Sequence, residues 1–138
     1  MEIDKNVDSF LSETRVAVLG TTGSDGYPHM VPIWFKWEDG EAYMFTSQNS
    51  TKWKNILKSP SASLCIDHRE APYAAVTIYG KIIASEEPFY ENIRSMAIRY
   101  LGENKGETFA DSYKDNPPEY IGFKLIPEKI HWNLKMVE

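Results

Sequence analysis

The segment YMFTSQNSTKWKNILKSP, residues 43–60, joins a predicted strand to a predicted helix. Its apolar first part is typical of a strand, and the lysine-rich part that follows has helical spacing. Pro60 ends the helix, because the residue before a proline avoids the helical region. The rest of the chain is interpreted outward from this strand and helix.

The junction between the two elements has two interpretations. The start of a helix offers free backbone N–H groups and the positive end of the helix dipole, which together favour a bound phosphate. The alternative is an ordinary helix cap, in which Asn49 or Ser50 accepts a backbone N–H and the lysines are solvated. The residues of the predicted phosphate site are Thr46, Ser47, Ser50, Lys52 and Lys54.

The segments around residues 43–60 predict antiparallel β structure. Residues 15–22 and 29–37 have strand patterns on either side of the turn sequence SDGYP, and an Asp-Gly turn leads into residues 42–47. These three strands are expected to form a meander. The further predicted strands cover residues 61–67, 73–85, 120–126 and 130–136, and the predicted helices cover residues 4–12, 51–59 and 88–101.

The pattern of six or seven strands predicts a mainly β fold in one domain, residues 1–138. Because the chain is short and has no alternating β–α–β units, a small closed or partly split antiparallel β-barrel fits best, with a sandwich as the next choice. Gly80 inside a strand indicates a bulge or a close approach of another backbone segment. The helix at residues 51–59 is expected to bury Trp53, Ile56 and Leu57 and to leave Asn55 outside, and residues 103–118 are expected to be a loop or a short helical piece.

Composition limits the classes of function. Fifteen basic and twenty acidic residues give a net charge of −5, which does not favour binding to nucleic acid or to an anionic membrane. No apolar run is long enough to span a membrane and the first residues are polar, so a cytoplasmic location is expected. Cys65 is the only cysteine and is expected to be a buried thiol. The three histidines lack metal-ligand spacing, so no metal site is predicted.

The segment around Pro32 predicts an opening in the sheet. Proline cannot donate a hydrogen bond, so it lies at a sheet edge or where strands separate. Unpaired backbone groups there can bind the edge of a planar heterocycle, and Trp34 could pack beside it, although a single aromatic residue on a strand is also typical of a core or an interface. Four tryptophans and eight tyrosines suggest a subunit interface as well.

Four segments in this order carry a family resemblance: residues 17–22, DGYPHMVPIWF at 25–35, YMFTS with STKWKNILKSP at 43–60, and PYAAVTIYGKI at 72–82. Together they resemble the pyridoxamine-5′-phosphate-oxidase-like family of flavin-binding split barrels. The chain looks most similar to its short members, which are FMN- or deazaflavin-dependent oxidoreductases. The resemblance implies a six-stranded split barrel and a homodimer with cofactor sites at the interface.

The resemblance also implies roles for individual residues. Ser50 and Lys52 would hold the cofactor phosphate, with Thr46 and Ser47 alongside, and Lys54 matches a position that is often basic in the family. The backbone of residues 31–34 would line the edge of the isoalloxazine ring. The full set of expected cofactor-binding residues is Val31, Pro32, Ile33, Trp34, Thr46, Ser47, Ser50, Lys52 and Lys54.

The expected function is an oxidoreductase that uses FMN, or alternatively the deazaflavin F-420, on a small-molecule substrate. No catalytic side chain is assigned, because the cofactor performs the hydride transfer. Pyridoxamine-phosphate oxidase activity itself is not expected, since no arginine follows Arg99. The alternatives are a flavin-binding or storage protein without turnover, and a haem-binding relative that uses His29 or His68.

Overall fold

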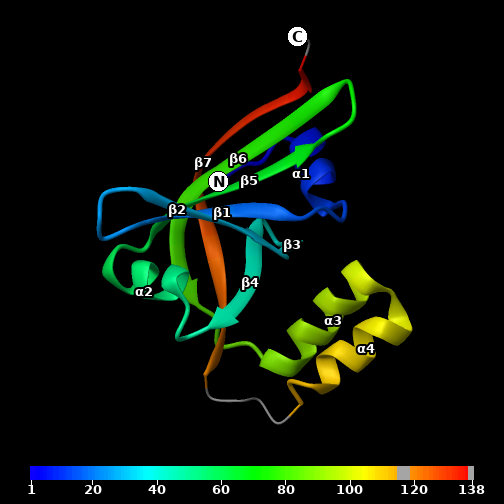
Figure 1. Cartoon of the computed structure of the whole chain (residues 1–138). Coiled ribbons are helices and arrows are strands. Elements are labelled where there is room, and N and C mark those ends of the chain that lie inside the picture. The colour runs from blue at the N-terminus through cyan, green and yellow to red at the C-terminus, as the bar shows by residue number, and fades with distance from the viewer. Residues whose placement is uncertain (115–118, 137–138) are drawn as a thin grey trace.

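The computed structural model describes residues 1–114 and 119–136, which form one antiparallel sheet and the helices that pack around it (Figure 1). The strands are β1 (Ala17–Thr22), β2 (Pro28–Ile33), β3 (Lys36–Glu38), β4 (Glu41–Ser47), β5 (Ser61–His68), β6 (Tyr73–Ala84) and β7 (Tyr120–Met136). The helices are α1 (Lys5–Ser12), α2 (Thr51–Lys58), α3 (Phe89–Leu101) and α4 (Glu103–Asp111). The order of strands in the sheet is β2-β1-β5-β6-β7-β4-β3.

The sheet curls because its two edge strands are neighbours in the sequence. β2 lies at one edge and β3 at the other, yet only Trp34 and Phe35 separate them in the chain. A connection this short brings the two edges together, so the sheet has the curvature of a split barrel. The predicted barrel class is therefore confirmed, with seven strands instead of six.

The predicted meander of three strands is wrong. Residues 29–37 do not form one strand, since they divide into β2 and β3. β2 pairs only with β1, and β4 pairs with β3 and β7. The alternation of side chains along residues 31–37 is the same in both arrangements, so the pattern alone could not locate the break.

The core fills the concave side of the sheet. Phe35, Trp37 and Met44 are buried there. The predicted N-terminal helix is confirmed as α1, which covers the core with Val7 and Leu11. The core residues are Val7, Leu11, Ala17, Leu19, Ile33, Phe35, Trp37, Ala42, Met44, Trp53, Ile56, Ala62, Leu64, Ile66, Val76, Ile78, Ile82, Phe123 and Leu125.

The predicted break at Pro127 is wrong, because β7 is one continuous strand of 17 residues. Its register against β6 shifts at this point: Tyr79 pairs with Lys129 and Gly80 pairs with Pro127, so Glu128 is the extra residue of a β-bulge. A bulge tolerates a proline that cannot donate to the ladder. Both features predicted at Gly80 are present: the register shift shows the bulge, and a Cβ at this position would overlap the backbone carbonyl of Ile126, which shows the close approach.

Helices α3 and α4 pack side by side as a hairpin beside the sheet (Figure 1). The stretch expected as a loop or short helical piece is therefore helical from Glu103 to Asp111, and residues 115–118 lie outside the described residues. An ion pair between Arg94 and Glu107 joins the two helices.

Two polar side chains, Lys36 and Tyr43, lie where α3 meets the sheet. Lys36 Nζ donates to Asn92 Oδ1 over 2.8 Å, which gives this half-buried ammonium a partner. The nearby Tyr43 side chain is 3% exposed, and its hydroxyl has no hydrogen-bond partner within residues 1–114 and 119–136. Burial and the carboxylate of Glu87 raise the pKa of Tyr43. A Cβ on Gly122 would overlap this hydroxyl, so the glycine leaves the space that the phenol occupies.

Candidate functional site

The junction between β4 and α2 forms the predicted helix cap. Ser50 Oγ accepts the backbone N–H of Trp53 over 3.2 Å and the hydroxyl of Thr46 over 3.0 Å. Ser47 Oγ accepts the N–H of Asn49 over 3.1 Å. The capping interpretation is thus confirmed for Ser50, and the structure brings the three predicted hydroxyl groups together at the start of α2.

The cap does not use every hydrogen-bond donor at the start of α2. Lys54 N–H donates to the Ser50 carbonyl, which is the first bond within the helix, at 3.1 Å. The N–H groups of Thr51 and Lys52 donate to no acceptor in the part of the chain that the structure describes. The Lys52 ammonium is half-buried and also lacks an ion-pair partner among these residues, and burial lowers its pKa. Capping and anion binding are therefore compatible here.

Helix α2 is held against the sheet by apolar and polar contacts. The Trp53 indole lies 5.6 Å from the Phe123 ring between centroids, and Ile56 is buried beside it. The prediction for the other two positions is wrong: Leu57 is 70% exposed, while Asn55 is buried. Asn55 takes the inner position because its Nδ2 donates to Thr21 Oγ1 on β1 over 3.1 Å.

The stretch from Val31 to Trp34 lies at the open edge of the sheet, as expected from Pro32. Val31 and Ile33 pack against the core and Pro32 is exposed, while β2 pairs on one side only. The structure thus places an unpaired backbone edge where the ring edge was predicted. Its role in binding a cofactor stays a prediction.

Trp34 is turned toward the helical hairpin. Its ring stacks on Tyr100 with 4.8 Å between centroids and 3° between planes, and lies 5.3 Å from Phe109. The Tyr100 hydroxyl accepts the N–H of Phe35 over 3.1 Å and donates to the carbonyl of Arg15 over 2.5 Å. These contacts fix the connection between the two edge strands to α3.

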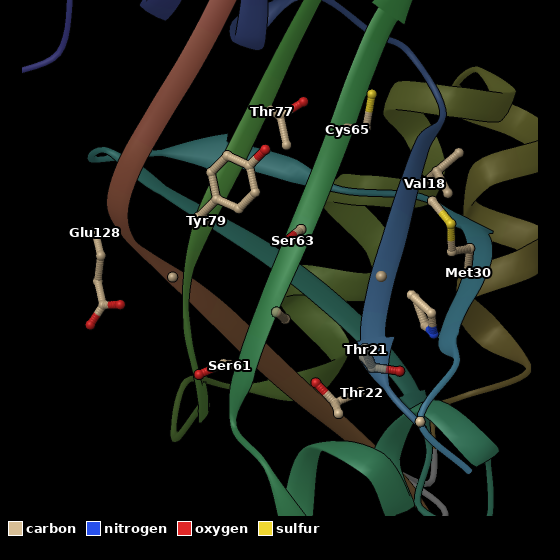
Figure 2. Close-up of a pocket in the computed structure, with 15 residues that line it drawn as sticks. Val18, Thr21, Thr22, Met30, Ser61, Ser63, Cys65, Thr77, Tyr79 and Glu128 are labelled. Carbon is tan, nitrogen blue, oxygen red and sulfur yellow. The ribbon is translucent and has the colours of Figure 1, made fainter. Parts of the chain in front are cut away.

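A cavity of about 770 Å³ lies on the convex face of the sheet, over β2, β1, β5 and β6 (Figure 2). Its walls consist of small, hydroxyl-bearing and apolar side chains, with one carboxylate at the bulge. The lining residues are Val18, Gly20, Thr21, Thr22, Gly26, Pro28, Met30, Ser61, Ala62, Ser63, Cys65, Thr77, Tyr79, Gly80 and Glu128. Cys65 is half-buried and belongs to this lining, so the prediction of a buried thiol is wrong.

Sequence reasoning missed this cavity. The signal was present in β1 and β5, where Val18, Gly20, Ser63 and Cys65 alternate with buried residues. Alternation of buried and less buried side chains identifies the residues that face away from the core. A hollow on that face depends on which strands become neighbours, and the pairing of β1 with β5 was not predicted. A second cavity of about 520 Å³ adjoins it at Val18 and includes His68.

Among the described residues, no three histidine, cysteine or acidic side chains gather closely enough to hold a metal ion. Within the same residues, no helix combines the length and hydropathy of a membrane span.

Solved structures share this fold. A conserved hypothetical protein, Rv2991, from Mycobacterium tuberculosis aligns with a TM-score of 0.77 and 21% identity over 97% of this chain and 86% of its own. HutZ, a haem storage protein from Vibrio cholerae, aligns with a TM-score of 0.69 and 15% identity over 98% of this chain and 96% of its own. An F420 reductase aligns with a TM-score of 0.65 and 16% identity over 94% of this chain and 98% of its own. At these identities the likeness concerns the fold alone.

No curated protein sequence matches the chain. The family model described as pyridoxamine 5′-phosphate oxidase matches residues 3–131, which include the capped helix start, the open edge of β2 and the lining of the convex cavity. A match over most of the chain agrees with the observed split-barrel topology, and the chain therefore belongs to the pyridoxamine 5′-phosphate oxidase family.

Proposed function

We propose that the protein is an oxidoreductase that binds a phosphorylated flavin, FMN or the deazaflavin F-420. The observation that carries the proposal is the start of α2, next to the hydroxyl groups of the cap: two adjacent N–H groups and the Lys52 ammonium there have no partner among residues 1–114 and 119–136. A half-buried ammonium without a counter-charge is costly, and a bound phosphate would supply that charge. The donor set therefore fits a phosphate monoester or diester.

In this proposal, three parts of the chain bind or position the flavin. The helix start binds the phosphate, and the unpaired edge of β2 accepts the polar rim of the ring. The stacked Trp34 and Tyr100 keep the connection between the edge strands rigid, so that this edge keeps its position. The bound flavin supplies hydride transfer, and the protein contributes binding and orientation.

A second copy of the chain would complete the site. Met30 and Tyr79 are 64% and 41% exposed on the convex face, and aromatic and Met side chains are enriched at interfaces. The homodimer predicted from the family resemblance fits this face. Sedimentation equilibrium should therefore give a mass near twice 15.9 kDa, whereas the mass of one chain would contradict the dimer.

The phosphate site is tested by Lys52→Ala. Loss of a charge-assisted hydrogen bond should weaken FMN binding by about 1.5–3 kcal/mol, or about 10- to 150-fold. Riboflavin lacks the phosphate, so its affinity should not change. Titration followed by flavin fluorescence gives both dissociation constants.

The matched control is Lys58→Ala, at the other end of the same helix, where the exposed side chain should contribute less than twofold. An unchanged FMN affinity in Lys52→Ala would place the phosphate elsewhere. If the wild-type protein takes up neither FMN nor F-420, the proposal fails. Stopped-flow reduction of the bound flavin by NADH, NADPH or reduced F-420 separates an oxidoreductase from a storage protein.

Haem binding is the second candidate. It is favoured by the half-buried His29, whose Nδ1 has no partner among the described residues, and by His68 in the second cavity. The haem storage protein HutZ shares the fold. A Soret band after reconstitution, together with no binding of flavin, would favour this candidate over the first.

A further inference from the structure

Five aromatic side chains form a continuous row between the sheet and the α3–α4 hairpin (Figure 1). Trp34 stacks on Tyr100 with 4.8 Å between centroids, and Phe109 lies 5.3 Å from Trp34. Phe109 lies 5.4 Å from Tyr113, and Tyr113 lies 4.9 Å from Tyr120, the first residue of β7. These separations are those of interacting aromatic pairs, so each ring contacts the next. We call these five residues the aromatic row.

The aromatic row is separate from the hydrophobic core. All five side chains are half-buried, and none of them belongs to the core cluster. The same hairpin makes its fully buried contacts with aliphatic side chains, such as Ile93 and Met96 of α3. Packing alone therefore does not require an unbroken line of rings at this place.

The two ends of the aromatic row can exchange a proton with water. Indole and phenol rings are among the side chains that lose a single electron most readily, and the loss is completed when the N–H or O–H proton leaves. Trp34 is half-buried, so water can accept its indole proton. Tyr120 lines a surface cavity of about 330 Å³, and the neighbouring Tyr113 is also half-buried.

Tyr100 differs from the other phenols of the row. Its hydroxyl donates to the Arg15 carbonyl over 2.5 Å and accepts the N–H of Phe35 over 3.1 Å. A backbone carbonyl is too weak a base to take the proton, and burial raises the pKa of Tyr100. Tyr100 therefore supports the Trp34 ring by stacking, while Tyr113 and Tyr120 are the phenols that can be oxidised.

We propose that the aromatic row carries an oxidising equivalent from Trp34 to the surface at Tyr113 and Tyr120. A one-electron oxidant takes an electron from the Trp34 indole, and the indole proton passes to water. Tyr113 then gives an electron to Trp34 through the Phe109 ring and releases its hydroxyl proton, while the indole regains a proton from water. A soluble thiol restores the phenol by giving it a hydrogen atom, and the thiol is oxidised instead of the protein.

The position of Trp34 suggests the source of the oxidant. Trp34 follows β2, whose open edge is the predicted place of the flavin ring. Flavins carry out one-electron and oxygen chemistry, which generates oxidants close to the ring. As a route that removes such oxidants from the flavin, the aromatic row rests on the proposed function. The transfer from Trp34 to Tyr113 does not depend on it.

The test is pulse radiolysis of the protein without flavin, with the azide radical as the oxidant. The azide radical becomes the azide anion and oxidises indoles faster than phenols at neutral pH. Trp132 is 45% exposed and would compete, so every protein tested carries Trp132→Phe. The absorption of the tryptophan radical should decay while that of the tyrosine radical rises, at a rate independent of protein concentration. Decay without formation of a tyrosine radical would overturn the proposal.

Tyr113→Phe is the decisive variant. It keeps the ring in the row and removes the phenol, so the fast conversion should be lost and the Trp34 radical should persist. The matched control is Tyr27→Phe, because Tyr27 is 74% exposed and lies outside the row, and it should convert like the background protein. Fast conversion in Tyr113→Phe equal to that of the background would overturn the assignment.

Phe109→Leu tests the path between the two ends. Leucine leaves Trp34 and Tyr113 in place but interrupts the rings between them, so the fast conversion should be lost. Phe109→Tyr keeps a ring at this position and should retain it. A lower melting temperature in Phe109→Leu with unchanged conversion would show that Phe109 serves packing only and would overturn the path.

Two outcomes separate this inference from the proposed function. If the conversion takes place in a protein that takes up neither FMN nor F-420, the aromatic row stands and the oxidoreductase proposal fails. If flavin binds and the conversion is absent, the proposed function stands and the inference fails.

Discussion

Trp53→Ala is expected to lower the free energy of unfolding by about 3–5 kcal/mol, the range for removing a buried tryptophan. Trp53 is 5% exposed and packs on Phe123, so its removal leaves a cavity between α2 and β7. Because Trp53 N–H also bonds to the capping Ser50, loosening of this turn should weaken FMN binding as well. Urea unfolding at several concentrations gives the stability, and flavin titration gives the affinity.

The control on the same helix is Leu57→Ala. Leu57 is 70% exposed, so its truncation should change the free energy of unfolding by less than about 0.5 kcal/mol. Comparable losses for both variants would mean that α2 packs in a different orientation. The pair therefore measures which face of the helix meets the sheet.

Gly122→Ala is expected to destabilise the protein by about 2–4 kcal/mol through overpacking. The added methyl group would overlap the Tyr43 hydroxyl, and the buried ring has no room to move away. Tyr43→Phe removes the closest overlapping atom but keeps ring carbons at 2.8 and 3.0 Å from the new Cβ, so it should restore part of the loss. The double variant should thus be more stable than the sum of the single effects indicates.

Tyr43→Phe alone supplies the control for this cycle. Its hydroxyl is buried without a partner among the described residues, so its removal should leave the free energy of unfolding unchanged or raise it by about 1 kcal/mol. A marked loss in Tyr43→Phe would reveal a hydrogen bond to the hydroxyl. Independent, additive effects of the two substitutions would show that Gly122 and Tyr43 do not meet. Thermal unfolding of all four proteins completes the cycle.

Local patterns predicted the elements well. The helices around Val7 and Trp53, the bulge at Gly80 and the open edge at Pro32 follow from spacing, glycine and proline chemistry, which act within a few residues. The cap at Ser50 and the hydroxyl cluster of the candidate site were predictable for the same reason.

Predictions that depended on distant pairing were less successful. The alternation through Trp34 and Phe35 continues across the gap between β2 and β3, so the sequence pattern contains no sign of the break. Asn55 replaced Leu57 on the inner face of α2 because Thr21, far away in sequence, provides a hydrogen-bond acceptor. The hollow around Gly20 likewise exists only because β1 and β5 are neighbours.

The position of β7 has a consequence for how the chain folds during synthesis. Residues 120–136 follow all other strands in the chain, yet β7 lies between β6 and β4 in the sheet. Until the ribosome has released this segment, β3 and β4 can pair only with each other and expose an unsatisfied edge. Such long-range pairing gives a high contact order, which slows folding and prolongs exposure to aggregation. The candidate site at the end of β4 therefore takes its final form late, after the most distant strand has arrived.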